Sequence, residues 1–118
     1  MGRYFYEKGA SKVRKTTLPV LDQIIEVLES LGRSVTIQGH TDSLSQEGQM
    51  SNWEISALRA GYIARYMLTK HQFPKSRISV AGYADTRPLA HNGSEKGRRL
   101  NRRIEIHVHY DANSPYNP

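Results

Sequence analysis

The chain has 118 residues, which suits a single domain, and its 37% hydrophobic residues allow a modest core. It contains no cysteine, which excludes thiol catalysis and cysteine-type zinc sites but fits an oxidising compartment and the cytosol equally well. Seventeen Lys and Arg residues against eleven Asp and Glu give a net charge of +6, which favours anionic partners such as nucleic acid, an acidic membrane surface or a polyanionic polymer. No apolar run predicts a membrane-spanning helix or a signal peptide.

The N-terminal half predicts a strand, a helix and a second strand. Aromatic residues dominate residues 3–7, which is typical of a short strand. Apolar residues then recur at spacings of three and four, which predicts an amphipathic helix capped by Thr16 or Thr17 and ended by Gly32. The apolar positions of this helix are Leu18, Leu21, Ile25 and Leu28. A second strand is predicted at residues 35–39, where apolar and polar residues alternate.

The C-terminal half begins with a long helix. Ser51 and Glu54 have capping-box spacing, so we expect the helix to start there and to run to about Lys70. Around the helix, we expect one set of side chains to face the sheet: Ile55, Leu58, Tyr62 and Tyr66. A third strand is predicted at residues 78–82, and a short helix at residues 95–101.

The last predicted strand is the clearest in the chain, because apolar and polar residues alternate from residue 103 to residue 110. The order β-α-β-α-β-(short α)-β predicts an α/β two-layer sandwich with a mixed sheet and the helices on one face. The alternation of the last strand predicts that the other face of the sheet is wet. Residues 1–118 are expected to form one domain, with an ordered core at 4–110 and a flexible tail at 111–118.

Asp42 and Arg59 are the residues whose placement asks for an explanation. The 3.6-residue period places Arg59 at the edge of the buried face of the long helix, on one stripe with Asn52 and Ser56. Asp42 follows the neighbouring strand and is the candidate partner of this guanidinium. The two residues form either an ordinary buried ion pair or a clamp for a zwitterion, in which Asp42 accepts from an ammonium and Arg59 holds a carboxylate.

Four segments, in order, resemble the OmpA-like C-terminal domain: GHTD, SNWEISALRA, GYADTRPL and GRRLNRRIEI. The resemblance covers roughly residues 4–110, and SNWE and GYADTRPL are most similar to flagellar stator proteins of the MotB type. It implies noncovalent peptidoglycan binding that anchors a flagellar stator complex, with no cofactor or metal and no enzymatic activity. It also implies a homodimer and a periplasmic fragment of an inner-membrane-anchored protein, whose absent N-terminal part meets the stator channel subunit.

The resemblance also implies which residues bind the ligand, the diaminopimelate of the peptidoglycan stem peptide. Asp42 would meet its ammonium and Arg59 its carboxylate. Four further residues would complete the pocket, and a fifth is a weaker candidate: Thr41, Asn52, Ser56 and Arg102, then Tyr6. Arg102 would approach the ligand from the last strand, whereas Arg103 would alternate to the other side.

Two alternatives to stator anchoring remain. Within the family, the domain could serve as an OmpA- or Pal-type tether between the outer membrane and the wall. Outside it, the arginine cluster at residues 98–103 favours a nucleic-acid-binding domain, but Asp42 in the same recess would repel a phosphate backbone.

Other chemistry is weakly indicated. His40, Asp42 and Ser56 do not predict a hydrolase, because Ser56 lies within a helix and lacks the glycines of a nucleophile elbow. His107 and His109 have no evident third ligand for a metal. Trp53 could stack on bases or sugars but is expected to pack against the protein.

Overall fold

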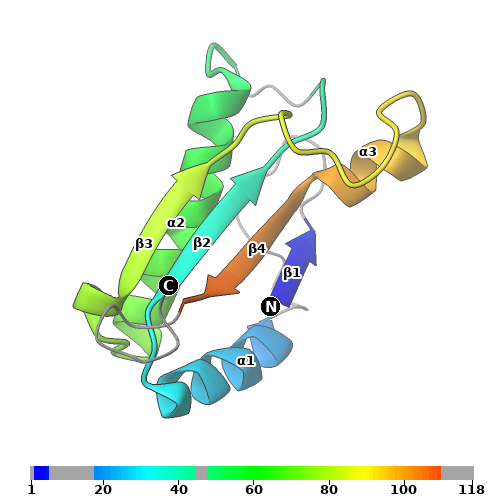
Figure 1. Ribbon diagram of the computed structural model, residues 1–118. Coiled ribbons are helices and arrows are strands. Elements are labelled where there is room, and N and C mark those ends of the chain that lie inside the picture. The colour runs from blue at the N-terminus through cyan, green and yellow to red at the C-terminus, as the bar shows by residue number, and fades with distance from the viewer. Residues whose placement is uncertain (1, 6–17, 45–47, 110–118) are drawn as a thin grey trace.

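The computed structural model describes residues 2–5, 18–44 and 48–109, which form a four-stranded sheet in the order β1-β4-β2-β3. The strands are β1 (Gly2–Phe5), β2 (Val35–His40), β3 (Ile78–Gly82) and β4 (Arg103–Val108). β2 and β3 are parallel, whereas β4 runs antiparallel to both β1 and β2 (Figure 1). The predicted mixed sheet is therefore confirmed, and its parallel pair is connected through the longest helix.

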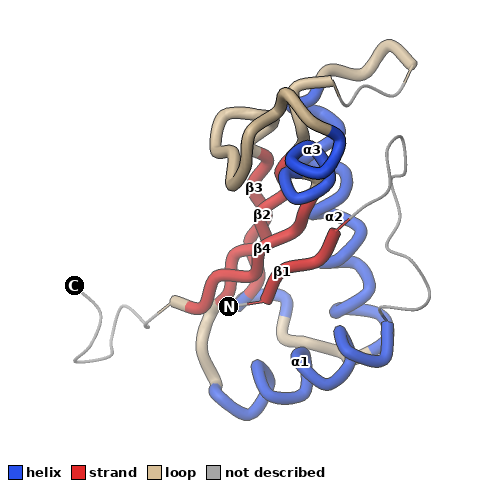
Figure 2. The backbone as a smooth tube through the Cα atoms, turned by 90° about the vertical axis from the view of Figure 1, so that its right-hand side faces the viewer, coloured by secondary structure: helices blue, strands red, loops and turns tan. Residues whose placement is uncertain are grey.

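Three helices and one short 3-10 turn complete the fold: α1 (Leu18–Leu31), α2 (Asn52–Lys70), η2 (Lys75–Arg77) and α3 (Glu95–Asn101). Figure 2 shows α1 and α2 on the same face of the sheet, as the two-layer prediction required. α3 lies at the end of the sheet where β2 and β3 finish and β4 begins (Figure 1). Across the described ranges, no helix combines the length and apolar character needed to cross a bilayer.

The core fills the space between the sheet and these two helices. The predicted stripe of α1 is confirmed, since Leu21, Ile25 and Leu28 are buried. They meet side chains from α2 and from the central strands, among them Ile63, Met67, Ile37, Ile104 and Ile106. Burying one such side chain contributes about 1.5–3 kcal/mol. This core contacts α2 from Ala60 to Met67, whereas the candidate site lies toward the N-terminal end of that helix.

The helix ends follow the expected chemistry where the structure describes them. The Ser51 hydroxyl accepts from the Glu54 amide at 3.2 Å, and the Glu54 carboxylate accepts from the Ser51 amide at 2.9 Å. This confirms the capping box of α2. Gly32 follows α1 with φ of +69°, a conformation that glycine adopts at no steric cost. The predicted caps Thr16 and Thr17 lie outside the described residues.

The predicted sheet-facing set of α2 is correct at Ile55, which is 1% exposed, but wrong at its other three positions. Ser56, Arg59 and Ile63 point into the protein, while Leu58, Tyr62 and Tyr66 are half-buried at its edge. The reason is a close approach of helix and sheet at two glycines. A Cβ on Gly39 would lie 1.9 Å from the Ser56 carbonyl oxygen, and one on Gly82 would lie 2.7 Å from the Ala57 nitrogen. Small residues at this crossing therefore bring the polar stripe of α2 onto the sheet.

The prediction of a wet second face is wrong at β4. Arg103 is 2% exposed and Glu105 6%, although both lie opposite the apolar side. Their burial is compensated by pairing, because Arg103 Nε donates to Glu105 at 2.6 Å and His107 Nε2 lies 2.9 Å from the same carboxylate. Burial alone would raise the pKa of Glu105, but the hydrogen bonds from Arg103 and His107 prevail and lower it to about 2.

Two smaller expectations are also corrected. Trp53 is 55% exposed, so it does not pack as expected. The last strand ends at Val108, two residues before the predicted end. Tyr6, Glu7 and the predicted tail at 111–118 lie outside the described residues.

Candidate ligand-binding site

Asp42 lies just beyond the end of β2 and is fully buried. One carboxylate oxygen accepts from Arg102 Nη1 at 2.5 Å, and the other accepts from the backbone amide of Leu44 at 2.7 Å. The predicted pairing of Asp42 with Arg59 stays a prediction. The ion pair with Arg102 is a partnership that sequence reasoning missed.

Arg102 is placed differently from the expectation. It caps the C-terminal end of α3, immediately before β4, and does not belong to the strand itself. Its guanidinium is 1% exposed and forks between two carboxylates, with Nη2 donating to Glu95 at 2.7 Å. Burial would lower the pKa of Arg102, but the bonds to Glu95 and Asp42 raise it. The hydrogen bond from Arg102 in turn lowers the pKa of Glu95.

The two linked ion pairs Asp42–Arg102 and Arg102–Glu95 extend from the interior to the surface. The side chain of Asp42 is 1% exposed, whereas that of Glu95 is 47% exposed. Arg59 is a second buried guanidinium of the site, 1% exposed on the sheet-facing stripe of α2. The candidate site thus carries charges of both signs, with carboxylates at Asp42 and Glu95 and guanidiniums at Arg59 and Arg102.

The Ser56 hydroxyl and the Thr41 backbone amide hold the loop that follows β3. Ser56 Oγ accepts from the Ala84 amide at 3.0 Å and donates to the Trp53 carbonyl at 3.0 Å. The Thr41 amide donates to the Ala84 carbonyl at 2.8 Å, and Thr41 Oγ1 donates to the Asp42 carbonyl at 2.9 Å. Both residues were predicted to contact ligand, and in this structure their described bonds shape the site.

Asn52 uses only one of its two side-chain hydrogen-bonding groups within the described residues. Its Nδ2 donates to the Asp42 carbonyl at 3.4 Å, which joins the first turn of α2 to the end of β2. Its Oδ1 is buried and makes no hydrogen bond in the part of the chain that the structure describes. A buried acceptor without a partner is costly, so this oxygen is suited to receive a ligand donor.

Asn101 is a further residue that sequence reasoning missed. Its Oδ1 accepts from the amides of Leu89 and Ala90 at 2.7 and 3.0 Å, and its Nδ2 donates to Asn92 Oδ1 at 2.8 Å. Asn92 Oδ1 also accepts from the Ser43 amide at 3.4 Å. These bonds connect the loop before α3 to the loop that carries Asp42. No local sequence signal reveals this role, although the seven-residue spacing of Glu95 and Arg102 places those two on one face of a helix.

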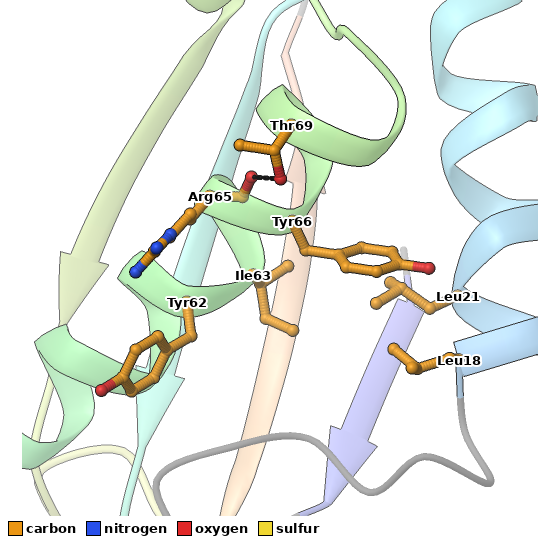
Figure 3. Close-up of a pocket in the computed structure, with 7 residues that line it drawn as sticks. All are labelled: Leu18, Leu21, Tyr62, Ile63, Arg65, Tyr66 and Thr69. Carbon is orange, nitrogen blue, oxygen red and sulfur yellow. Dashed lines mark hydrogen bonds between the residues drawn. The ribbon is translucent and has the colours of Figure 1, made fainter.

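Figure 3 shows a separate hollow of about 370 Å³ between α1 and α2. Leu18 and Leu21 line it from α1, and Tyr62, Arg65 and Tyr66 line it from α2. Arg65 is the only charged residue among those lining it, and its carbonyl is occupied by the Thr69 hydroxyl at 2.8 Å. This hollow lacks the paired charges of the site around Asp42, and it is not a candidate for binding a zwitterion.

Residues 5–102 match the OmpA family. The chain belongs to the OmpA family. It is 37% identical over 103 residues to YtxE of Bacillus subtilis, covering 86% of this chain and 43% of that protein. It is 30% identical over 105 residues to Motility protein B of the same organism, covering 86% and 40%. The chain therefore spans about two fifths of the length of these relatives.

Solved structures agree with this family membership. The cell wall anchor of the T6SS from Pseudomonas aeruginosa superposes with a TM-score of 0.78 at 30% identity, covering 91% of this chain and 76% of that one. The C-terminal domain of Helicobacter pylori MotB superposes with a TM-score of 0.83 at 23% identity, covering 96% and 89%. The second similarity shows that the OmpA-family domain described here shares the MotB fold.

Proposed function

We propose that this OmpA-family domain binds peptidoglycan noncovalently and anchors a flagellar motor stator complex to the cell wall. Its family, its similarity to Motility protein B and its similarity to a cell wall anchor support the proposal. The observation that carries it is the burial of three charged side chains, Asp42, Arg59 and Arg102, together with the Asn52 Oδ1 atom, which has no hydrogen-bond partner among the described residues. Such a cluster suits a small ligand that carries both charges.

The ligand that fits this chemistry is the zwitterionic centre of diaminopimelate in the stem peptide. Its ammonium is bound by Asp42 and by the Asn52 oxygen, while its carboxylate is bound by Arg59 and Arg102. Thr41 and Ser56 complete the pocket, in agreement with the resemblance described above. A zwitterion adds no net charge to the buried cluster, so each ligand charge meets an opposite charge after both are desolvated. A guanidinium fork adds directional, bidentate hydrogen bonds to the carboxylate.

The stator role brings further proposals with it. The domain would lie in the periplasm as part of an inner-membrane-anchored protein, would form a homodimer, and would reach the channel subunit through other parts of that protein. The second candidate is a tether between outer membrane and wall, favoured by 28% identity over 108 residues to outer membrane porin F of Pseudomonas aeruginosa. A nucleic-acid role is disfavoured, because Asp42 and Glu95 place two carboxylates in the site.

The experiment that tests the ligand chemistry compares two stem peptides that differ in one group. Calorimetric titration with a diaminopimelate-containing tripeptide should give saturable binding. The same peptide amidated at the carboxylate of the D-centre should bind at least about tenfold more weakly, since the guanidiniums lose a charged acceptor. Equal affinity for the two peptides would contradict the proposed clamp, and no binding of either peptide would contradict recognition of the stem.

A further inference from the structure

We propose that Glu95 occupies the place of the ligand carboxylate on Arg102 and that the ligand must displace it in order to bind. This inference rests on the proposed peptidoglycan binding and adds a residue that controls affinity and selectivity. Glu95 belongs to neither the predicted pocket nor the four resemblance segments. Its role follows from the way in which Arg102 divides its two Nη atoms between an inner and an outer carboxylate.

The two carboxylates differ in access to solvent. Arg102 Nη1 meets Asp42, whose side chain is 1% exposed, and Nη2 meets Glu95, whose side chain is 47% exposed. The hydrogen bond between Nη2 and Glu95 is 2.7 Å long. A ligand that arrives from solvent therefore meets Glu95 before it meets Arg102, and the inner pair with Asp42 can stay intact during exchange.

Exchange of one carboxylate for another leaves the guanidinium satisfied. A buried arginine that simply lost its outer partner would pay a large desolvation cost, but a ligand carboxylate restores the same charge-assisted bond. Release of Glu95 costs less than release of a buried carboxylate would, because the half-exposed glutamate regains water while the ligand satisfies Arg102. The replacement requires a carboxylate, so a neutral amide cannot compete on equal terms.

Glu95 also has a second cation close by. Its other oxygen lies 3.6 Å from Arg98 Nη2, one turn further along α3. When the ligand takes Nη2 of Arg102, the displaced side chain can move toward Arg98 and stays in the first turn of α3. In the unliganded domain Glu95 contacts both cations, so in this proposal it covers Arg102 until the ligand arrives and then keeps its contact with Arg98.

The consequence is a weaker but more selective site. Glu95 competes with the ligand for Arg102. The apparent affinity is therefore the intrinsic affinity multiplied by the fraction of molecules in which Arg102 is available. Ligands that lack the carboxylate leave Glu95 in place. Removal of the competitor should therefore increase affinity for the free acid and leave affinity for the amide unchanged.

The test uses Glu95→Gln and Glu95→Asp, with Glu26→Gln as the matched control. Glu26 is an exposed residue of α1, so its substitution changes the net charge equally and far from the site. Glu95→Asp keeps the charge but shortens the side chain by one methylene, which separates loss of the contact from a change in local charge. Calorimetry would measure each variant against the diaminopimelate-containing tripeptide and its amidated form.

We expect both Glu95 variants to bind the free-acid peptide about tenfold more tightly than wild type, with no gain for the amide and no change in Glu26→Gln. Equal or weaker binding by the Glu95 variants, with thermal unfolding still cooperative, would overturn the competitor role while leaving the proposed function intact. If wild type binds neither peptide, the proposed function and this inference are both wrong.

Discussion

At the scale of single residues, Arg102 holds the site together. It is almost fully buried, it bridges the interior carboxylate of Asp42 and the surface carboxylate of Glu95, and it ends α3. Only a planar guanidinium offers two donors in a fixed fork to two separate carboxylates. Lysine has a single ammonium and cannot reproduce this geometry, although it keeps the charge.

Arg102→Lys should therefore lower the free energy of unfolding by about 1–3 kcal/mol, because one buried carboxylate loses its bond. Urea unfolding followed by circular dichroism would measure the change. Arg99→Lys is the matched control, since Arg99 is an exposed residue of the same helix. Equal stability of Arg102→Lys and the control would show that the fork does not stabilise the fold.

His40 links stability to pH. It is 1% exposed, and its ring stacks on Tyr83 with centroids 5.4 Å apart. Burial, reinforced by the positive charge of Arg103, lowers the pKa of His40 from 6.5 to about 4. Between pH 6.5 and pH 4, His40 is protonated in the unfolded chain but neutral in the folded chain. The free energy of unfolding is therefore highest above pH 6.5 and decreases as the pH falls toward 4.

We expect His40 to cost about 3 kcal/mol of stability across this range. In His40→Gln, urea unfolding should lose this part of its pH dependence. The exposed His91→Gln serves as control, and it should retain the wild-type slope. Identical slopes in wild type and His40→Gln would argue against the buried neutral imidazole.

Part of the site follows from sequence alone. Asp42 and Arg59 could be singled out because ionisable groups at the end of a strand and on a buried helix face need partners. The pairing of Asp42 with Arg102 could not, because the two residues are sixty positions apart and meet only through the placement of α3. Asn101 was missed because its partners lie in the loop between β3 and α3, which has no periodic pattern. Glu95 was missed although it stands seven positions before Arg102, because the spacing alone does not show that Arg102 is buried.

At the scale of elements, the contact between α2 and the sheet determines which side chains line the site. Gly39 and Gly82 let the helix backbone come close, and this turns Ser56 and Arg59 inward. Periodicity predicted the existence and ends of α2 correctly. It misplaced the buried stripe because apolar content alone ranks Tyr62 and Tyr66 above Arg59.

Gly39→Ala tests this close approach. The added Cβ would lie 1.9 Å from the Ser56 carbonyl oxygen. Because that oxygen belongs to the backbone of α2, the helix has to move. We expect a loss of about 3 kcal/mol or more in chemical unfolding, at the upper end of overpacking effects. Gly61→Ala is the control, because a Cβ at this position meets nothing within 4 Å. The substitution also replaces a glycine in a helix interior by a better helix former. A Gly39→Ala variant as stable as this control would contradict the close contact.

The last strand shows why alternation predicts faces less reliably than elements. The two faces of β4 do separate apolar from polar residues, as predicted. Alternation cannot show that Arg103 and Glu105 satisfy each other and are therefore buried. A polar side chain on a strand is not necessarily exposed, because an ion pair with a second hydrogen-bond partner tolerates burial.

At the scale of the whole molecule, the fold brings the end of β2, the start of α2 and α3 to one end of the sheet (Figure 1). The candidate site lies there, whereas the core shared with α1 lies toward the other end. The net charge of +6 favours an anionic polymer as partner. Family membership and this charge both support the proposed cell-wall ligand, and we propose that the paired charges of the site select one group within that polymer.

The most direct measurement is co-sedimentation of the folded domain with purified peptidoglycan sacculi, comparing wild type, Asp42→Asn and the control Glu26→Gln. Asp42→Asn keeps the size of the side chain but removes the charge that we propose binds the ammonium. The account predicts that wild type and Glu26→Gln sediment with the sacculi, whereas folded Asp42→Asn stays in the supernatant. Sedimentation of all three would remove Asp42 from recognition, and a wild-type domain that stays in the supernatant would contradict peptidoglycan binding itself.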